Sequence, residues 1–356
     1  MKVIVPCAGS SSRFPDMAPK WMLPDYDGVP MVVRAVEGLD CSQDQFVFTI
    51  LREHEERFKA SEGLKQAFGG DVECVILEKP TDSQSETVAE TIRRCAINES
   101  FLVKDSDNFF RLEQIEENVN FISVASLNDF DMINARNKSY VQVDQDNIIT
   151  SIREKHVISD LFSVGGYYFQ DAAEYLEAFD SLSQAGRFEK GELYLSEIIA
   201  HMILNGSAFQ AKHALDYQDW GTVHEWRQEL SRRRLHLVSL DGFLFERGST
   251  YFSPSFSEVQ ANEEAVRAVR KMADSQHTIV YLSIRPESYR EMTLEQMRNN
   301  DIPDAPIIFG CGIAQWSLVT SGHSSLPFNT SQAIEISPDD PNILEKLDLL
   351  KAGGAV

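Results

Sequence analysis

The chain has 356 residues, which is too long for one typical hydrophobic core and predicts two domains. Hydrophobic residues make up 43% of the sequence and charged residues 25%, an ordinary composition for a globular protein. The formal net charge of −22 would repel nucleic acid and anionic membranes, so the sequence excludes both as partners. A bound nucleotide would therefore need a local basic site.

Cysteine and histidine usage argues against a disulfide-linked protein and against a zinc protein. The 5 cysteines are scattered and form no CxxC pair, as expected of reduced thiols, and the 8 histidines show no metal-ligand spacing, so a zinc site is not expected. The N-terminus leads straight into a predicted strand without a leader pattern, and no apolar run approaches membrane-spanning length. We therefore expect a cytoplasmic protein.

The first predicted element is a short buried strand, VIVP at 3–6, followed by a loop of small residues. Such a loop lets backbone N–H groups approach a polyanion, and Arg13 and Lys20 follow it with positive charge. An ordinary surface turn with two solvated cations explains the loop alone equally well. The loop has neither the GK[ST] ending of a P-loop nor the three glycines of a dinucleotide fingerprint.

Strands and helices then alternate along the chain, which predicts a mainly parallel sheet covered by helices. Predicted strands lie at 46–51, 72–77, 101–105 and 121–126, and predicted helices at 30–38, 53–68 and 85–97. A hairpin at 140–155 with its turn at 144–147, a strand at 162–169 and helices at 171–183 and 192–204 complete this part.

Two carboxylates, Asp105 and Asp107, follow the predicted strand at 101–105, at the sheet edge where ligands of α/β proteins gather. Residues two apart on a strand point to the same face, so both could bind one hard cation such as magnesium. The alternative is a capped turn in which Asp107 bonds local backbone.

A second strand and helix alternation starts after the basic segment RQELSRRR at 227–234. It comprises a strand and turn at 235–245, an amphipathic helix at 257–273, a strand at 278–286, a helix at 288–299 and a strand at 305–310. We place the domain boundary near residue 232, which predicts domains 1–232 and 233–356. The expected fold class is α/β, with two three-layer Rossmann-like domains of which the second is smaller.

Four features together resemble a known family: the N-terminal loop with its two cations, the strand-end DSDNFF, the pair Glu154–Lys155, and SVGGYYF followed later by YQDWGT. Over residues 1–226 the chain resembles the nucleotidyltransferases that couple a nucleoside triphosphate to a sugar phosphate or small alcohol phosphate. It departs from the family's GxGxR loop at Ser11, which stands where the second glycine is usual.

The resemblance implies roles for particular residues. The arginine and lysine of the loop, Arg13 and Lys20, are implied in catalysis, and Asp107 and Asp219 in binding magnesium. The implied nucleotide-binding residues are Ala8, Gly9, Ser10, Ser11, Ser12, Gln84 and Thr87. The implied acceptor-binding residues are Glu154, Lys155 and Gly166, although for Gly166 and its neighbour Gly165 a packing role is at least equally expected.

The implied reaction is attack by a phosphate oxygen of the acceptor on the α-phosphorus of the triphosphate, with release of pyrophosphate. The expected partners are thus a nucleoside triphosphate, a phosphorylated small-molecule acceptor and Mg²⁺, and the expected pathway is the synthesis of a surface polysaccharide. The sequence leaves the base, the acceptor and homo-oligomerisation open. A non-catalytic nucleotide- or sugar-binding regulatory protein is the alternative from another functional class.

Residues 235–356 resemble the haloacid dehalogenase-like (HAD-like) phosphatases in outline, through LVSLDGFLF and YLSIRPE. Ser239 stands at the position of the family's aspartate nucleophile, and Asp241 matches its second aspartate. Ser283 matches the phosphate-contacting hydroxyl, and VTSGHSS at 319–325 lacks the expected carboxylate. We therefore expect a pseudophosphatase, and the alternative is a bifunctional transferase and phosphatase.

Overall fold

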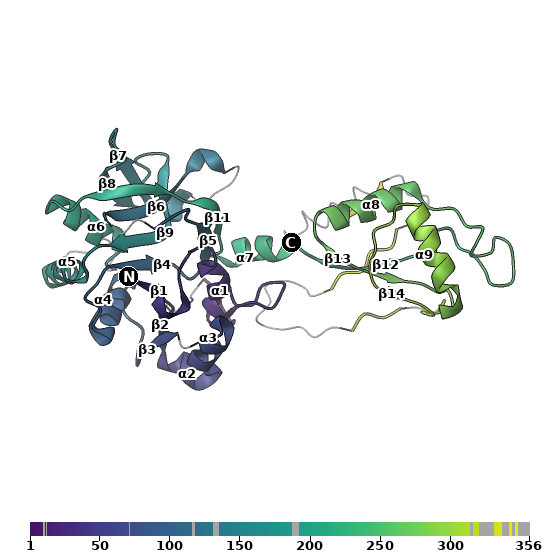
Figure 1. The fold of residues 1–356 in the computed structure, drawn as a ribbon, viewed down its shortest axis with the longest axis horizontal. Helices are drawn as coiled ribbons and strands as arrows, with labels where there is room; N and C mark the ends of the chain where they lie inside the picture. The colour runs from purple at the N-terminus through teal and green to yellow at the C-terminus, as the bar shows by residue number, and fades with distance from the viewer. Residues whose placement is uncertain are drawn as a thin grey trace. The chain divides into compact units, whose positions relative to one another are not determined.

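The computed structural model describes most of the chain. The described residues are 1–9, 11, 13–70, 72–115, 118–130, 135–186, 192–313, 316–319, 331–336, 342–343 and 346–347. The chain divides into two compact units, Met1–Thr222 and Val223–Val356 (Figure 1). This division precedes helix α7 (Val223–Ser231), whereas the boundary predicted from sequence follows it.

The first unit is built on a nine-stranded sheet whose main order is β10-β6-β9-β4-β1-β2-β3, with the hairpin β7–β8 joined through β9. All neighbours on this path pair in parallel except β9, which is antiparallel to both β4 and β6. The strands are β1 (Lys2–Pro6), β2 (Phe46–Leu51), β3 (Glu73–Leu77), β4 (Phe101–Lys104), β6 (Asn120–Ser126), β7 (Ser139–Val143), β8 (Ile149–Glu154), β9 (Leu161–Phe169) and β10 (Phe209–His213).

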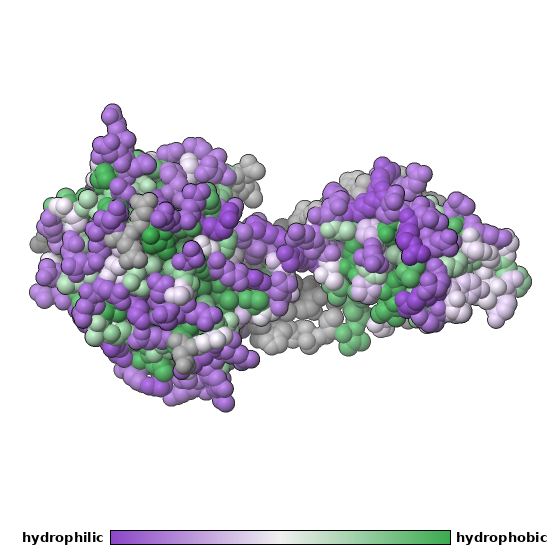
Figure 2. Space-filling model, viewed as in Figure 1, coloured by the Kyte–Doolittle hydropathy of each residue, from purple (hydrophilic) through white to green (hydrophobic). Residues whose placement is uncertain are grey.

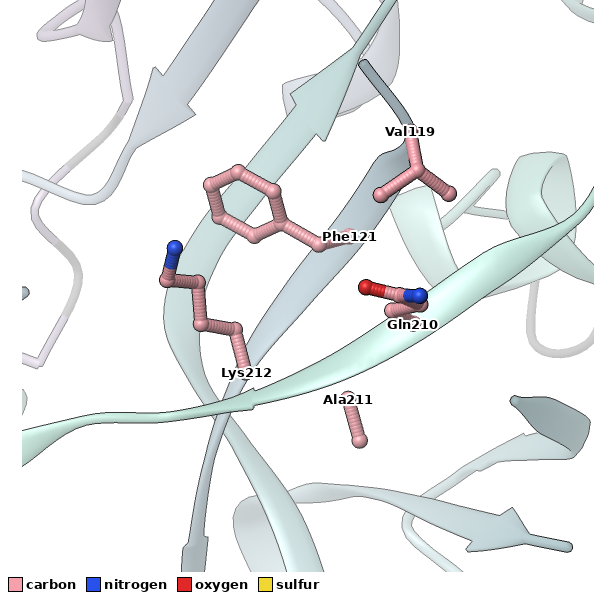
Figure 3. A pocket seen from close by; sticks show the side chains of 5 residues that line it. All are labelled: Val119, Phe121, Gln210, Ala211 and Lys212. Atoms are coloured by element: carbon pink, nitrogen blue, oxygen red, sulfur yellow. The ribbon is translucent and has the colours of Figure 1, made fainter. Parts of the chain in front are cut away.

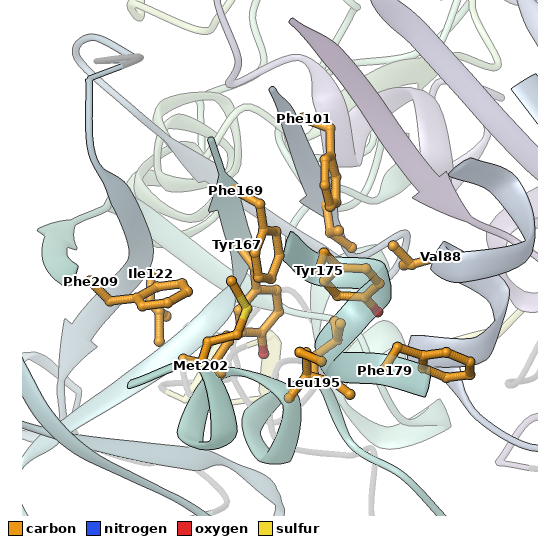
Figure 4. Close-up of a cluster of buried hydrophobic side chains, with 14 of the residues drawn as sticks. Val88, Phe101, Ile122, Tyr167, Phe169, Tyr175, Phe179, Leu195, Met202 and Phe209 are labelled. Atoms are coloured by element: carbon orange, nitrogen blue, oxygen red, sulfur yellow. The ribbon is translucent and has the colours of Figure 1, made fainter. Parts of the chain in front are cut away.

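Helices cover both faces of this sheet, because alternate strand residues point to opposite sides. In β4, Phe101 and Val103 join one hydrophobic cluster and Leu102 the other. The first cluster packs helices α4 (Gln84–Cys95), α5 (Ala172–Ala185) and α6 (Leu195–Leu204) on the sheet (Figure 4). The second packs α1 (Met31–Val36) and α3 (Ala60–Phe68) on the other face. The predicted layered α/β arrangement is therefore present in this unit.

The segment predicted as one helix at 53–68 is two helices, α2 (Arg52–Phe58) and α3. Between them Lys59 has φ 50°, in the left-handed region that ends a helix. The Glu55 carboxylate then accepts hydrogen bonds from the backbone N–H and the hydroxyl of Ser61, both at 2.8 Å. This local bonding stabilises the break, which the hydrophobic periodicity does not reveal.

A small second sheet pairs β5 (Asn108–Arg111) with β11 (Leu215–Asp219) in antiparallel register. The sequence analysis predicted neither strand, and it also missed β10. Strand β11 is short and has no buried residue, so it shows no hydrophobic alternation. Its pairing nevertheless brings the end of the first unit's sequence to the segment that follows β4.

The second unit contains a three-stranded parallel sheet in the order β12-β13-β14. Its elements are β12 (Leu235–Ser239), α8 (Glu263–Asp274), β13 (Thr278–Leu282), α9 (Arg290–Asn299) and β14 (Ile307–Ile308). The side chain of Asn262 caps α8 by accepting from the N–H groups of Glu264 and Ala265. Of the segment 319–325, only Val319 lies within the described residues.

In the view of Figure 2, hydrophilic residues predominate on the visible face of each unit. This agrees with the net charge of −22. Among the residues that the structure describes, no helix combines the length and the apolar character that a membrane span needs.

Candidate functional site

The candidate site lies where β1 and β4 end, side by side in the parallel sheet. The loop of small residues follows β1, and the two carboxylates predicted from sequence follow β4. Ligands of α/β proteins bind outside the carboxyl ends of such strands. The sheet therefore brings together two segments that are about a hundred residues apart in sequence.

The loop after β1 contains a residue in a backbone conformation that favours glycine. Ser11 has φ 50°, so the position where the resembled family carries glycine is one where a side chain is disfavoured. Its hydroxyl oxygen accepts a hydrogen bond of 3.1 Å from the N–H of Lys20, which ties the two ends of the loop together. Ala8 is buried and Gly9 is open, whereas Ser10 and Ser12 lie outside the described residues.

Asp107 is held by both predicted cations of the N-terminal segment. Lys20 Nζ donates to Asp107 Oδ2, and Arg13 Nη2 lies 3.7 Å from the same oxygen. Burial alone would raise the pKa of Asp107, but these neighbouring charges outweigh it and hold the pKa well below its usual range. The carboxylate is therefore charged at neutral pH and faces the basic loop.

The β5–β11 pairing places Asp219 beside Asp107. Asp219 is the register partner of Asn108, and the N–H of Trp220 donates to the backbone oxygen of Asp107 at 2.9 Å. These backbone bonds fix the relative position of two residues that are 112 apart in sequence. The sequence analysis predicted their convergence only through the family resemblance.

Gly221 marks the space on which the charged groups converge. A Cβ atom built on Gly221 would lie 3.1 Å from Asp219 Oδ1, 3.5 Å from Asp107 Oδ2 and 3.3 Å from Arg13 Nη1. Two carboxylate oxygens and one guanidinium nitrogen thus surround one small volume that the missing side chain leaves free. The structure therefore brings Asp107, Asp219 and Arg13 into one site.

A lysine that the sequence analysis did not single out binds the second carboxylate. Lys138 Nζ donates to Asp219 Oδ2 and also to the hydroxyl of Tyr217, at 2.6 Å. The Lys138 side chain is only 10% exposed, so this ion pair is largely shielded from water. No motif marks Lys138, because its contact with Asp219 joins segments that are 81 residues apart in sequence.

Asp105 does not share one strand face with Asp107, and that part of the prediction is wrong. Strand β4 ends at Lys104, so the two aspartates lie in the turn between β4 and β5. Gln84 Nε2 donates to Asp105 Oδ1 at 2.5 Å. Burial and the nearby charge of Asp107 raise the pKa of Asp105 above its usual value.

The turn between β4 and β5 is stabilised by the Lys104 ammonium and packs tightly against Gly165. Lys104 is fully buried, and its ammonium donates to the backbone oxygens of Asp105 and Asn108 at 2.8 and 2.9 Å. Burial lowers the pKa of Lys104 to about 7. Gly165 has φ +86°, and a Cβ there would collide with the Asp105 carboxylate and lie 2.6 Å from Asn108 Nδ2.

The predicted base-recognition residues occupy different environments. Gln84 reaches the site through its bond to Asp105. Thr87 is buried in α4, where its hydroxyl bonds the Thr81 hydroxyl at 2.6 Å and the backbone oxygen of Ser83 at 3.2 Å. The structure therefore does not bring Thr87 to the cluster around Asp107.

The predicted acceptor residues form a second group at the end of β8. The Glu154 carboxylate accepts hydrogen bonds from the hydroxyls of Ser139 and of Ser196, the latter at 2.9 Å. Lys155 has φ 56°, and its ammonium donates to the Tyr194 hydroxyl at 2.8 Å. Partial burial opposes protonation of Lys155, but the bond to Tyr194 and nearby acidic groups raise its pKa.

Two links connect this group to the first. The N–H of Lys155 donates to the backbone oxygen of Lys138 at 2.9 Å. Tyr167 is buried, and the charges of Asp105 and Glu154 both contribute to raising its pKa after the larger effect of burial. The acceptor group and the carboxylate cluster are therefore neighbours.

Gly166 packs inside the sheet. A Cβ there would lie 2.6 Å from the Phe110 ring and 2.6 Å from the Ser123 hydroxyl. This geometry supports the packing role that the sequence analysis kept open for Gly166.

The chemistry of the cluster around Gly221 suits a hard divalent cation. Two carboxylates face one volume, and Mg²⁺ binds carboxylate oxygens in small number, completing its shell with phosphate and water. Within the described parts of the chain, no group of three or more His, Cys, Asp or Glu side chains could hold a metal ion. Two carboxylates alone would leave the remaining coordination positions of such an ion to phosphate oxygens and water.

A small pocket of about 130 Å³ lies elsewhere, lined by Val119, Phe121, Gln210, Ala211 and Lys212 (Figure 3). Phe121 is near the start of β6, and β6 runs parallel to β4 because both are antiparallel to β9. The pocket therefore sits toward the opposite edge of the sheet from the carboxylate cluster.

In the second unit, Asp241 is enclosed by hydrogen-bond donors. Its Oδ2 accepts from the Ser283 hydroxyl at 2.7 Å and from the N–H of Ile284 at 3.1 Å, and its Oδ1 accepts from Arg285 Nε at 2.8 Å. The Asp241 and Arg285 side chains are 1% and 0% exposed. The Ser239 hydroxyl donates to the backbone oxygen of Asp241 at 2.9 Å. Asp241, Ser283 and Arg285 thus form a buried hydrogen-bonded network, and the half-buried Ser239 bonds to the Asp241 backbone.

Comparison with known proteins gives structural matches only. No family model matches the sequence, and no curated protein matches it. A nucleoside-diphosphate-sugar pyrophosphorylase from Vibrio cholerae RC9 is similar with a TM-score of 0.55 and 23% identity, over 64% of this chain and 99% of that chain. The inositol-1-phosphate CTP transferase from T. maritima is similar with a TM-score of 0.50 and 16% identity, over 63% and 90%.

A CTP:phosphocholine cytidylyltransferase from Streptococcus pneumoniae is also similar, with a TM-score of 0.50 and 15% identity over 64% of this chain and 97% of that chain. At these identities the similarity establishes the fold. About two thirds of this chain therefore has the α/β fold found in nucleotidyltransferases.

Proposed function

We propose that the chain is a magnesium-dependent nucleotidyltransferase that couples a nucleoside triphosphate to a sugar phosphate or small alcohol phosphate and releases pyrophosphate. The observation that carries the proposal is the convergence of Asp107, Asp219 and Arg13 on the free volume at Gly221. The shared fold supports it, because the similar structures are named as pyrophosphorylases and cytidylyltransferases.

The main task of such a site is to bring two polyanions together. The cations of the N-terminal segment, Arg13 and Lys20, would face the triphosphate, and the loop N–H groups would add hydrogen bonds. Magnesium bound by Asp107 and Asp219 would supply further positive charge at the phosphates. The chain as a whole carries −22, so this local positive charge is what would attract the nucleotide.

The reaction itself needs no general base. A phosphate oxygen of the acceptor is already an anion at neutral pH, and it attacks the α-phosphorus in line with the bond to the leaving pyrophosphate. One P–O bond forms as the bond between the α-phosphorus and the bridging oxygen breaks. Positioning and electrostatic stabilisation by the protein supply the rate enhancement.

We assign acceptor binding to the group at the end of β8. Lys155 is a protonated cation next to the Lys138 backbone and would bind the acceptor's phosphate. Glu154 is oriented by the Ser139 and Ser196 hydroxyls and can accept hydrogen bonds from acceptor hydroxyl groups. A phosphorylated polyol or sugar combines both features, and a role in surface polysaccharide synthesis is consistent with such an acceptor.

We further propose that the second unit is a HAD-like domain without phosphatase activity. Asp241 is occupied by Ser283 and the buried guanidinium of Arg285, so it is not free to exchange a proton with a substrate. Ser239 occupies the position expected for the nucleophile, and its hydroxyl is bonded to nearby backbone.

The test measures pyrophosphate release by the full-length protein with each common nucleoside triphosphate, Mg²⁺ and a panel of phosphorylated sugars and alcohols. We expect release with at least one pair, and a loss of at least about 100-fold in kcat/KM for Asp107→Asn and for Asp219→Asn. Asp216→Asn is the matched control, because Asp216 lies on the same strand and pairs with the exposed Arg111.

Each outcome decides between the candidate functions. No release with any pair would favour the non-catalytic binding protein. Release that survives both aspartate substitutions would contradict the assigned site. Phosphate release from simple phosphomonoesters would show that the second unit is a phosphatase and that the chain is bifunctional.

A further inference from the structure

Lys138 is a buried cation whose partners lie in the candidate site. Its ammonium binds the Asp219 carboxylate and the Tyr217 hydroxyl, and it lies 5.1 Å from the centre of the Tyr217 ring and 5.8 Å from that of Phe162. The Lys138 ammonium is therefore directed at one of the two carboxylates assigned to the metal.

Lys138 and Lys20 play equivalent parts on the two sides of the site. Lys20 donates to Asp107 Oδ2, and Lys138 donates to Asp219 Oδ2. The two carboxylates are thus each neutralised by one ammonium, and the Arg13 guanidinium adds positive charge. Without bound substrate, the two facing carboxylates do not repel each other strongly, because both are already paired.

This pairing has a consequence for metal binding. A divalent cation that enters alone must compete with both ammoniums for carboxylate oxygens, and it leaves Lys20 and Lys138 without their anionic partners. A triphosphate that enters with the metal provides new anionic oxygens for both ammoniums. Bound metal therefore makes the binding free energy of triphosphate more favourable, and bound triphosphate does the same for the metal.

We infer that Lys138 is a further residue of the nucleotide site, which suppresses binding of the free metal at Asp219 and makes metal and triphosphate binding depend on each other. This inference rests on the proposed function. Lys138 acts through Asp219 in the free protein and is a positioning residue in that state. Its backbone oxygen also accepts from the N–H of Lys155, so the same residue joins the metal and acceptor groups.

The decisive substitution is Lys138→Met, which keeps the length and apolar contacts of the side chain and removes its charge. Binding of Mn²⁺ alone, of inorganic triphosphate alone and of both together is measured by titration calorimetry on the full-length protein. We expect Mn²⁺ alone to bind about tenfold tighter, and triphosphate in the presence of Mn²⁺ to bind about tenfold more weakly. The energetic coupling between the two ligands falls accordingly.

Two further variants separate this role from a structural one. Lys138→Arg keeps the cation and should restore both affinities to near the values of the unsubstituted protein. Lys212→Met is the matched control, because Lys212 also lies over an aromatic ring, 5.4 Å from the centre of Phe121, but lines the pocket away from the site. Lys138→Gln replaces Lys138→Met if the latter fails to fold.

The test is specific because Lys138→Met is predicted to strengthen Mn²⁺ binding and to weaken triphosphate binding. Weaker Mn²⁺ binding in Lys138→Met, or affinities unchanged by that substitution, would overturn the inference and leave Lys138 as a support for Asp219. Failure of the proposed function is distinguishable from this result. It would appear as wild-type coupling of Mn²⁺ and triphosphate with no pyrophosphate release from any pair of substrates.

Discussion

Substitution of Gly221 by alanine tests the geometry of the site with the smallest possible change. The added methyl carbon would lie 3.1 Å from Asp219 Oδ1 and 3.5 Å from Asp107 Oδ2. Ordinary contacts of a Cβ atom begin at about 3.4 Å, and magnesium binds oxygen at about 2.0–2.1 Å. A metal bound to both carboxylates on the side of Gly221 would therefore meet the added methyl group.

The structure gives the size of the effect on activity and on stability. Gly221 is not in the left-handed region, so alanine fits its backbone, and the carboxylate has to move by only a few tenths of an ångström. The free energy of unfolding should change by about 1 kcal/mol or less. Displacement of the metal and the reacting phosphates should lower kcat/KM by about 100-fold or more.

The assay is pyrophosphate release as a function of Mg²⁺ concentration, combined with thermal unfolding of the same preparation. Gly63→Ala in α3 is the control, because a Cβ there meets nothing within 4 Å and alanine favours a helix. If Gly221→Ala retained the metal dependence and kcat/KM of the unsubstituted protein, the convergence of the carboxylates on a metal would be refuted.

Three other predictions concern stability and pH. Gly165→Ala should destabilise the first unit by about 2–4 kcal/mol in denaturant unfolding, because Gly165 has a positive φ and a Cβ there collides with Asp105. A smaller loss of stability would contradict this packing. Arg285→Met should cost about 3–5 kcal/mol by leaving the Asp241 charge buried, while pyrophosphate release stays unchanged. Burial and a neighbouring histidine lower the pKa of His236 to about 4, below the unfolded value of about 6.5. As the pH falls, the unfolded chain therefore binds a proton at this histidine before the folded chain does. Unfolding free energy should therefore fall between about pH 6.5 and 4, and less steeply in His236→Gln; identical slopes would contradict this.

The sequence predicts the main sheet because its strands are buried on both faces. Runs such as FVFTIL at 46–51 are apolar throughout and correspond to β2, with every residue buried. By contrast, β11 is polar and is held by backbone pairing with β5, so periodicity cannot reveal it. Elements that depend on a distant partner rather than on their own apolar pattern are the ones missed.

The residues of the candidate site also fall into two groups, those that a local pattern predicts and those that a distant partner positions. Asp107 follows a recognisable strand, and Arg13 and Lys20 follow a recognisable loop, so local pattern finds them. Lys138 has no local signature, since its partner Asp219 lies 81 residues further along the chain.

Thr87 shows the limit of reading a side chain's surroundings from a motif position. Its place in the chain matches the segment that the resembled family uses for the nucleotide, but its side chain is buried and its hydroxyl bonds that of Thr81. A position in a motif does not determine which way a side chain points.

The most direct test of the central claim is to locate the metal. Crystals of the full-length protein grown with Mn²⁺ and inorganic triphosphate would give an anomalous difference map at the manganese edge. We predict one strong peak at bonding distance from an oxygen of Asp107 and an oxygen of Asp219, next to the space at Gly221. A manganese ion bound elsewhere, or bound to only one of the two carboxylates with the other still paired to its lysine, would contradict the account.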